Sequence, residues 1–276
     1  MKWEGNRESD NVEDRRGSGG GGGMPVFGGR SIGIGTIVIA LVGGWVLGIN
    51  PLTILGLLSG GGMPAQVQQA PAQRPPADDT MARFVSTVLA DTEDVWQTVF
   101  REGGGRYQEP RLVLFRGATP TACGTGQAAM GPFYCPADQK VYIDLGFYET
   151  LKSRLGAPGD FAQAYVIAHE VGHHVQHLLG ITSKVDQMRG RVSQKEYNAM
   201  SVRLELQADC FAGVWAHHAQ NARQILEQGD VEEAMNAAAR IGDDALQRAS
   251  GGAVVPDSFT HGSSAQRQRW FHTGLK

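Results

Sequence analysis

The stretch Ala164–His177 constrains the fold more than any other part of the chain. It reads Ala-Tyr-Val-Ile-Ala-His-Glu-Val-Gly-His-His-Val-Gln-His, so an apolar run leads directly into a His-Glu-x-x-His motif. On a helix, residues four apart lie on one face, one turn above the other. His169 and His173 can therefore direct two imidazole rings at one metal ion, with Glu170 beside them. The pattern predicts an active-site helix over about 160–179.

Two histidines and a glutamate at this spacing are typical of a catalytic zinc site. Such a site takes three protein ligands and leaves one position for water. Glu170 is close enough to reach that water and to act as its general base. Three titratable groups inside an apolar helix would be costly to bury without such a purpose. The motif therefore predicts one Zn²⁺ ion and the hydrolysis of peptide bonds.

The third zinc ligand must come from outside this motif. A metzincin would place Gly at 176 and His at 179, whereas this chain has Gln176 and Leu179, which excludes that class. The alternative is a carboxylate from a following helix, here predicted over 193–220. Glu205 and Asp209 lie four apart on one face of it, among apolar neighbours. We expect Glu205 to bind the metal. Asp209 would accept a hydrogen bond from the outer nitrogen of a ligand histidine.

An oxyanion that develops during hydrolysis needs a donor from the protein beside the metal. His261 lies in a Gly-flanked loop within reach of the site, and it is the candidate donor; simple solvent exposure is the alternative. Three tyrosines are weaker candidates: Tyr142, Tyr165 and Tyr197. His174 and His177 are left out of the ligand set. The first projects about 100° round the helix from its neighbour, and the second lies a further turn along.

Residues 31–58 contain no charged side chain, and their apolar core covers 31–49. A membrane helix needs roughly 20 mostly apolar residues, and glycine is common in such helices. We therefore predict a single transmembrane helix that contacts the lipid bilayer. A buried core helix and a cleaved signal peptide are the alternatives. No polar face is visible, however, and the apolar run is longer than that of a usual signal peptide.

The orientation of this predicted span follows from its flanking charges. Arg15, Arg16 and Arg30 precede the span, and the first basic residue after it is Arg74. Cytoplasmic flanks carry the excess of basic residues. The pattern predicts a single-pass membrane protein with a cytoplasmic N-terminus and a catalytic domain in the periplasm or outside the cell.

The remaining segments differ in composition. Residues 1–30 are polar and Gly-rich, and we predict a disordered cytoplasmic segment. Residues 59–79 are rich in Pro, Gln and Gly, which is typical of a linker. Residues 80–276 have an ordinary globular composition and form the predicted zinc metallopeptidase domain. The net charge of −3 offers no basic face, so no nucleic-acid partner is predicted.

The predicted fold class is α+β, mostly α: a zincin-like catalytic domain with a small β-sheet edge and an active-site helix, preceded by a single transmembrane helix. Besides the helices above, periodicity and caps predict the following elements: helices from Thr80 to about 102 and over 230–249, and strands at 111–115 and 140–144. The strand at 140–144 is either an edge that binds an extended substrate or an ordinary core strand.

The cysteines are interpreted from their positions. Cys123 and Cys135 lie twelve apart in a loop predicted over 117–138, on the predicted oxidising side of the membrane. A disulfide between them would staple a stretch that has little core of its own. Metal binding is the rival hypothesis, but neither residue has a CxxC partner. Cys210 lies among apolar residues of the second long helix and is predicted to be a buried thiol.

These segments together resemble the neutral zinc metallopeptidase family of bacterial membrane-anchored proteins, over nearly the whole chain. The resemblance rests on the Gly-rich N-terminus and the apolar span, and on these motifs: Cys123 with Gly-Pro-Phe-Tyr-Cys135-Pro, Val-Tyr-Ile-Asp144, His-Glu-Val-Gly-His-His174, Glu205-Leu-Gln-Ala-Asp-Cys-Phe-Ala-Gly213 and Thr-His-Gly-Ser-Ser-Ala-Gln-Arg267. It implies a zinc-dependent peptidase of the zincin kind that acts on peptides or proteins, with Glu205 as third ligand.

A more distant similarity concerns the segment around His261. Thr260-His261-Gly262 followed by Arg267 looks like the Thr-His-Pro segment of membrane-associated gluzincins, although this chain has Gly where those have Pro. Two other functions fit less well. A catalytically inactive metal-binding scaffold or interaction protein at the membrane would not need Glu170, which is intact. A structural zinc domain needs a fourth protein ligand, and none is evident.

Overall fold

The computed structural model describes residues 1–17, 73–127, 131–251 and 253–276. The predicted transmembrane helix at 31–58 lies outside these residues, as does most of the predicted linker at 59–79. Within the described ranges, no helix is both long and apolar enough to cross a membrane. These ranges form a mostly helical α+β fold with two small sheets.

The larger sheet has four strands in the order β1-β2-β6-β5. They are β1 Val12–Asp14, β2 Arg111–Phe115, β6 Lys140–Asp144 and β5 Phe133–Cys135. The first three run parallel, and β5 pairs with β6 in the antiparallel direction. The strands predicted at 111–115 and 140–144 are confirmed. Because β6 is hydrogen-bonded on both sides, it is a core strand. Among the described strands, the edge on that side of the sheet is β5, so the hypothesis that 140–144 is the edge is wrong.

Helix α3, Thr80–Glu102, contributes buried side chains to the main hydrophobic core, and its ends agree with the prediction. The side chain of Asp79 accepts a hydrogen bond from the amide of Ala82 at the start, and the helix ends at Gly103. Such a cap satisfies one of the amide groups that a helix leaves unpaired at its N-terminus.

Residues 1–17, which we call the N-terminal arm, fold against β2 and α3. Val12 pairs with Leu112 in β2 and belongs to the core, and the ring of Trp3 lies 5.4 Å from that of Phe84 in α3. The predicted disorder of 1–30 is therefore wrong for this part. The arm brings apolar side chains to the core and pairs its charges with the domain. The sequence prediction treated residues 1–30 as one segment, and the glycines that follow the arm outweighed its few apolar residues.

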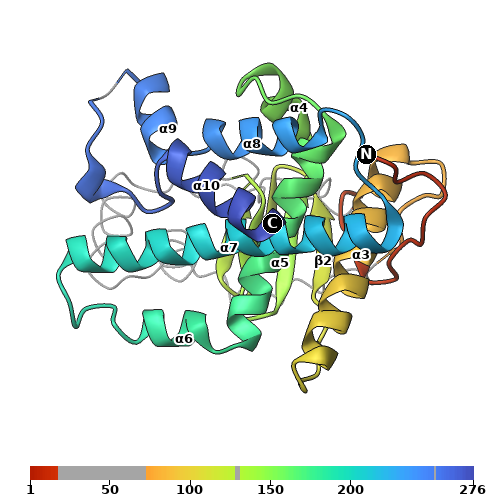
Figure 1. Ribbon diagram of the computed structural model, residues 1–276, viewed down its shortest axis with the longest axis horizontal. Helices are drawn as coiled ribbons and strands as arrows, with labels where there is room; N and C mark the ends of the chain where they lie inside the picture. The colour runs from red at the N-terminus through yellow and green to blue at the C-terminus, as the bar shows by residue number, and fades with distance from the viewer. Residues whose placement is uncertain (18–72, 128–130, 252) are drawn as a thin grey trace, which may run out of the picture. The chain divides into compact units, whose positions relative to one another are not determined.

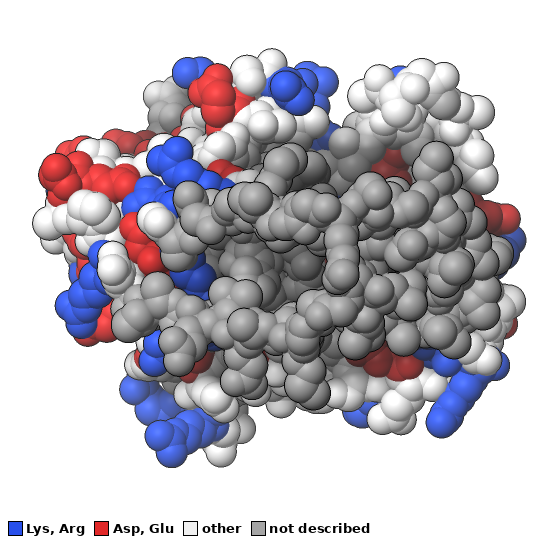
Figure 2. Space-filling model, turned by 180° about the vertical axis from the view of Figure 1, so that it is seen from behind, with Lys and Arg blue, Asp and Glu red and all other residues white. Residues whose placement is uncertain are grey.

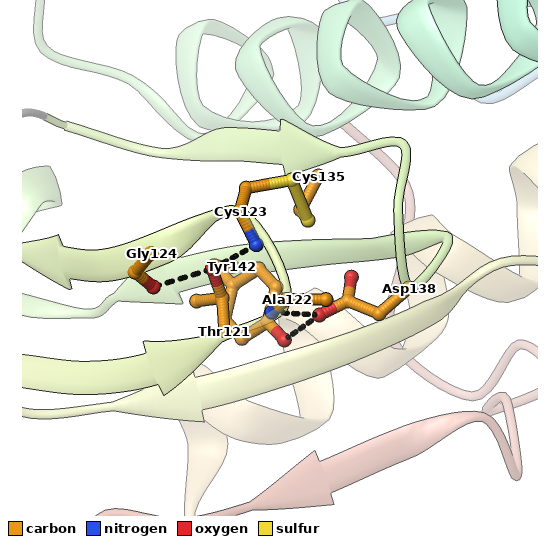
Figure 3. Close-up of a disulfide and its surroundings, with 7 residues drawn as sticks. All are labelled: Thr121, Ala122, Cys123, Gly124, Cys135, Asp138 and Tyr142. Carbon is orange, nitrogen blue, oxygen red and sulfur yellow. Dashed lines mark hydrogen bonds between the residues drawn. A yellow bond between two sulfur atoms is a disulfide. The ribbon is translucent and has the colours of Figure 1, made fainter. Parts of the chain in front are cut away.

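The segment 117–138 contains strands where the sequence predicted only a loop. A hairpin of β3, Ala118–Thr121, and β4, Gly124–Gln127, precedes the edge strand β5. A disulfide joins Cys123 in the hairpin turn to Cys135 in β5, with sulfurs 2.02 Å apart (Figure 3). This is the pairing expected from the sequence. The carboxylate of Asp138 accepts hydrogen bonds from the amide of Ala122 and the hydroxyl of Tyr142, which ties the hairpin to β6.

The rest of the domain is helical. Its elements are α4 Gly146–Ser153, α5 Asp160–Leu178, α6 Ile181–Asp186, α7 Gln194–Arg223, α8 Asp230–Arg240, α9 Asp243–Ala249, the 3₁₀ turn η3 Pro256–Ser258 and α10 Ser264–Leu275. Helix α7 begins where the sequence predicted, and Ser193 and Glu196 form a capping box at its start. The helix predicted over 230–249 is two helices. Ile241 and Gly242 lie between them. The backbone of Gly242 approaches Ser264 so closely that a Cβ there would lie 2.5 Å from that amide nitrogen.

Helix α5 is the central element of the helical part. It packs against α3, α7, α8 and the sheet, and Figure 1 shows α7 running across it with α10 alongside α7. Most of its side chains are buried, among them Phe161, Tyr165 and Ile167. The predicted metal motif therefore lies on a helix in the interior of the domain.

On the face shown in Figure 2, acidic and basic side chains of the described residues are interspersed.

Candidate metal centre

Helix α5 presents His169 and His173 on one face, as their spacing predicted. The centroids of the two rings are 4.8 Å apart. His169 is buried, and His173 is partly exposed because it faces a cavity. The helix that carries the two imidazoles is itself fixed by packing on several sides, which favours a rigid ligand geometry.

Helix α7 brings Glu205 to these two rings. Its Oε2 lies 3.2 Å from Nε2 of His169, and its Oε1 lies 3.3 Å from Nε2 of His173. The approach of α7 to α5 depends on Gly172 in the motif. A Cβ at this glycine would lie 3.0 Å from the carbonyl oxygen of Ala208 and 3.1 Å from its Cα. The absent side chain therefore lets the two helix backbones meet closely.

The three side chains fit a zinc ion. Their ligand atoms all lie within 4.8 Å of one another. Ligand atoms at 2.0–2.1 Å from a tetrahedral Zn²⁺ lie roughly 3.3–3.4 Å apart, close to the separations between Glu205 and each histidine. Two imidazole nitrogens and one carboxylate are also the donor set of a catalytic zinc site with one position left for water.

Asp209, one turn along α7 from Glu205, orients the first histidine. Its Oδ1 lies 2.9 Å from Nδ1 of His169, so this nitrogen donates to the carboxylate and Nε2 is left for the metal. Arg267 from α10 donates from Nε and Nη2 to the two oxygens of Asp209, both at 2.9 Å. Burial raises the pKa of Asp209, but the charges of Arg267 and His169 outweigh it and hold the pKa below its usual value.

Gln176 orients the second histidine. Its Oε1 lies 2.9 Å from Nδ1 of His173, and its own amide nitrogen donates to the carbonyl oxygen of Leu204 at 2.7 Å. The amide oxygen can only accept, so Nδ1 of His173 carries the proton and Nε2 is free to bind a metal. Gln176, which together with Leu179 excluded the metzincin class, thus orients one of the predicted zinc ligands.

Comparison with known proteins agrees with this centre. The sequence matches the family model described as "Putative neutral zinc metallopeptidase" over residues 1–276. The chain belongs to this family. It is 54% identical over 282 residues to the uncharacterized protein YpfJ of Escherichia coli (strain K12), an alignment that covers 100% of this chain and 95% of that protein.

A mycobacterial relative covers less of the chain. The uncharacterized protein Rv2575 of Mycobacterium tuberculosis (strain ATCC 25618 / H37Rv) is 40% identical over 206 residues, which cover 70% of this chain and 68% of the relative. No solved structure matches the chain. Membership of the neutral zinc metallopeptidase family assigns zinc and peptide substrates at the level of the family, and the residue roles rest on the geometry.

Glu170 faces a cavity of about 1040 Å³ that His169, His173 and Glu205 also line. Its side chain is buried, and burial raises the pKa of its carboxyl above the ordinary value, against the opposing effect of the neighbouring histidines. A carboxylate with a raised pKa is a better proton acceptor at neutral pH than an exposed one. Its position beside the ligands suits a general base.

His261 lines the same cavity from the loop between η3 and α10. The carboxylate of Asp243 accepts hydrogen bonds from the amides of Thr260, His261 and Gly262, at 2.8, 2.6 and 2.9 Å. It also lies 3.0 Å from Nδ1 of His261. This bond raises the pKa of the His261 imidazole, although partial burial opposes it. Asp243 therefore fixes both the loop and the ring.

The residues that the sequence left out of the ligand set have other roles. His174 is buried, with Nδ1 accepting from the hydroxyl of Tyr134 and Nε2 2.6 Å from the carbonyl oxygen of Gln108. Burial lowers its pKa to about 4, so the ring is neutral. His177 contacts the ring of Tyr134 and is not part of the metal-ligand group.

The three tyrosines that were weaker candidates for the oxyanion donor differ in whether they line the cavity. Tyr142 donates to Asp138 and does not line the cavity, and Tyr165 is buried with its hydroxyl donating to Asp209. Tyr197 does line the cavity, and its ring lies under the guanidinium of Arg189.

Cys210, expected to be buried, is a partly exposed free thiol.

Sequence reasoning gave no role to Gln176, Asp243 or Arg267. Gln176 continues the i, i+3 row of the motif from His173, and this spacing was the signal available for it. Asp243 and Arg267 reach the site from segments that are distant in the chain. No local pattern in the sequence shows which helix each of them meets.

Proposed function

We propose that this protein is a zinc-dependent endopeptidase that uses His169, His173 and Glu205 as zinc ligands and Glu170 as general base. The observation that carries the proposal is the convergence of these three ligand atoms beside Glu170 in one cavity. A bound zinc ion supplies a water of lowered pKa and a positive charge for the developing oxyanion. The remaining chemistry belongs to side chains of this chain.

Glu170 takes the proton from the attacking water and later gives it to the leaving amine. Burial raises the pKa of this carboxyl, which brings it closer to the range that suits a general base. Asp209 and Gln176 keep the proton of each ligand histidine on Nδ1, so that the ring orientation does not change during turnover.

His261 is the oxyanion donor in this proposal. Because Nδ1 donates to Asp243, only the protonated imidazole also offers an N–H at Nε2. The hydrogen bond to Asp243 raises the pKa of His261, which favours this cationic form. The negative charge of Glu205, which lines the same cavity, also raises the pKa of His261.

The edge strand β5 is the place where an extended peptide would bind. Phe133 and Tyr134 of this strand line the cavity, and β5 pairs only with β6 among the described strands. A substrate strand added to this edge would be held by main-chain hydrogen bonds, with side-chain pockets giving the selectivity. The disulfide Cys123–Cys135 connects this edge strand to the β3–β4 hairpin.

The decisive experiment compares the full-length protein with its Glu170→Gln variant on an unbiased peptide library, with and without a chelator. Zinc content is measured for both by elemental analysis. We expect equal zinc content, cleavage by the native protein only in the absence of chelator, and a loss in kcat/KM of at least about 10²-fold in the variant. Equal activity of two zinc-loaded proteins would exclude the peptidase mechanism and favour a metal-binding scaffold.

The ligand set has a separate test. Glu205→Ala and His173→Ala should each lose zinc, whereas the same substitution at Glu196, an exposed residue of the same helix as Glu205, should not. Retention of zinc by Glu205→Ala would remove Glu205 from the ligand set without touching the roles of the two histidines.

A further inference from the structure

The two chain segments that flank residues 18–72 meet in the structure. The amide of Asp14 donates to the carbonyl oxygen of Gln73 at 2.7 Å, and the two residues form an antiparallel bridge. Arg16 then pairs with Asp14 and with Asp79, each at 2.6 Å, and Asp79 is the cap of α3. The chain therefore leaves the domain and returns to it at one place.

The N-terminal arm is attached to the domain along its whole length. Arg7 pairs with Glu93 and Asp94 of α3, at 3.0 and 2.7 Å. The carboxylate of Glu13 in β1 lies 3.0 Å from the ammonium of Lys140 in β6 and 3.2 Å from the guanidinium of Arg111 in β2. With the β1–β2 ladder and the buried Val12, these contacts make the arm a structural part of the domain.

We propose that the arm and the metal centre lie on the same side of any membrane that residues 31–58 enter. A hydrocarbon layer is about 30 Å thick and separates the water phases on its two sides. A single crossing between the arm and α3 would place β1 and β2 in different phases, where they cannot pair. The chain between residues 17 and 73 therefore crosses such a membrane either not at all or an even number of times.

This inference changes the topology expected from the arginines. Arg15 and Arg16 belong to the arm, and Arg74 belongs to the returning segment beside it, so the three residues share one side of the membrane. Their distribution along the sequence therefore gives no orientation. The inference rests on the pairing of the arm with the domain, and it does not depend on peptidase activity.

Cysteine labelling in cells tests the shared side. Glu4 in the arm and Glu102 at the end of α3 are both exposed, so Glu4→Cys and Glu102→Cys are matched substitutions at accessible positions. A membrane-impermeant maleimide is applied to intact cells and to permeabilised cells that produce the full-length chain. The parent protein with its native cysteines gives the background.

We expect the two variants to behave alike: both are labelled in intact cells, or both only after permeabilisation. Labelling of one variant in intact cells while the other needs permeabilisation would overturn the proposal. Asn6→Cys provides a second exposed arm position if Glu4→Cys reacts poorly after permeabilisation.

A stability measurement tests the attachment independently. Val12→Asp places a charge in the core contact of β1 and should lower the Tm of the domain by roughly 5–15 °C. Asp10→Ala, at a side chain that is 81% exposed in the same arm, should leave the Tm unchanged. An unchanged Tm for Val12→Asp would show that the arm is not attached, and the proposal would fall.

Discussion

At the scale of single residues, Asp209 depends on a partner from the far end of the chain. Arg267 provides two of the hydrogen bonds to its carboxylate, and both residues are buried. Replacing Arg267 with Met leaves a buried carboxylate without its cation and loosens the orientation of His169. We predict a loss of about 10- to 100-fold in zinc affinity, measured by competition with a chelating dye.

Two variants make this prediction specific. Arg267→Lys keeps the charge but not the paired donors, so it should restore only part of the affinity. Arg269→Met changes an exposed residue of the same helix and should bind zinc like the native protein. Native zinc affinity in a folded Arg267→Met protein, checked by circular dichroism, would contradict the role of Arg267.

The Asp243–His261 pair leads to a prediction about pH. The bond to Asp243 raises the pKa of His261, so the protonated donor persists until the pH rises through that value. In Asp243→Asn the amide oxygen still accepts hydrogen bonds, but the negative charge is gone and the pKa of His261 falls. The alkaline limb of the kcat/KM profile should move to lower pH by roughly one unit. An unmoved limb would exclude His261 as the titrating donor.

The residues of the centre differ in how far the sequence predicts them. The positions of His169, Glu170 and His173 follow from helical spacing within one motif, and the pair Glu205 and Asp209 follows from the same spacing in a second helix. Arg267 and Asp243 could not be predicted, because their roles depend on how α9 and α10 dock. That docking is set by tertiary contacts which leave no periodic pattern near either residue.

At the scale of elements, the contact between α5 and α7 sets the metal geometry. Gly172→Ala adds a methyl group 3.0 Å from the carbonyl oxygen of Ala208, a backbone atom that moves only with its helix. Alanine favours a helix over glycine by up to about 1 kcal/mol, so α5 alone would gain stability. We nevertheless predict weaker zinc binding. The added methyl group would push α7 away from α5, and Glu205 would move with α7 away from the two histidines. Calorimetric titration of the apo protein measures it, and an unchanged Kd would contradict the prediction.

Helix ends were predictable where local chemistry fixes them. Asp79 and Ser193 cap α3 and α7 through their own side chains, and both helices begin where the sequence indicated. The break at Gly242 was not predicted, and the close approach of its backbone to Ser264 is a tertiary contact that leaves no local signal. The short strands of the hairpin contain Gly, Pro and Thr, and they lack the apolar alternation that identifies a strand.

At the scale of the whole molecule, the fold depends on a strand that the sequence did not suggest. Composition predicted that the first 30 residues lie outside the domain, yet β1 completes the sheet and carries Glu13 into a cluster of basic residues. A three-residue strand with two acidic positions has no hydrophobic signal of its own. Its partners lie in β2 and β6, far along the chain, so only the folded chain reveals them.

Glu13 therefore provides a test of whether the arm unfolds together with the domain. Burial raises its pKa, but Lys140 and Arg15 outweigh that effect and hold the pKa below the usual value. A depressed pKa stabilises the fold above the unfolded-state pKa, and this contribution is lost as the pH falls through the folded-state pKa. Glu13→Gln should lower the free energy of unfolding at pH 7 by about 1–3 kcal/mol, and the deficit should shrink below about pH 4.3.

Urea unfolding at several pH values measures this deficit, and the chain offers a matched control. Glu8→Gln makes the same change in the same arm, but its ion pair with Arg83 is 43% exposed on both sides and should contribute less than about 0.5 kcal/mol. If Glu13→Gln matches Glu8→Gln, the arm does not belong to the cooperative unit. If the larger deficit appears within a single transition, the N-terminal strand and the zinc-binding helices unfold as one body, although residues 18–72 separate the arm from the rest of the domain along the chain.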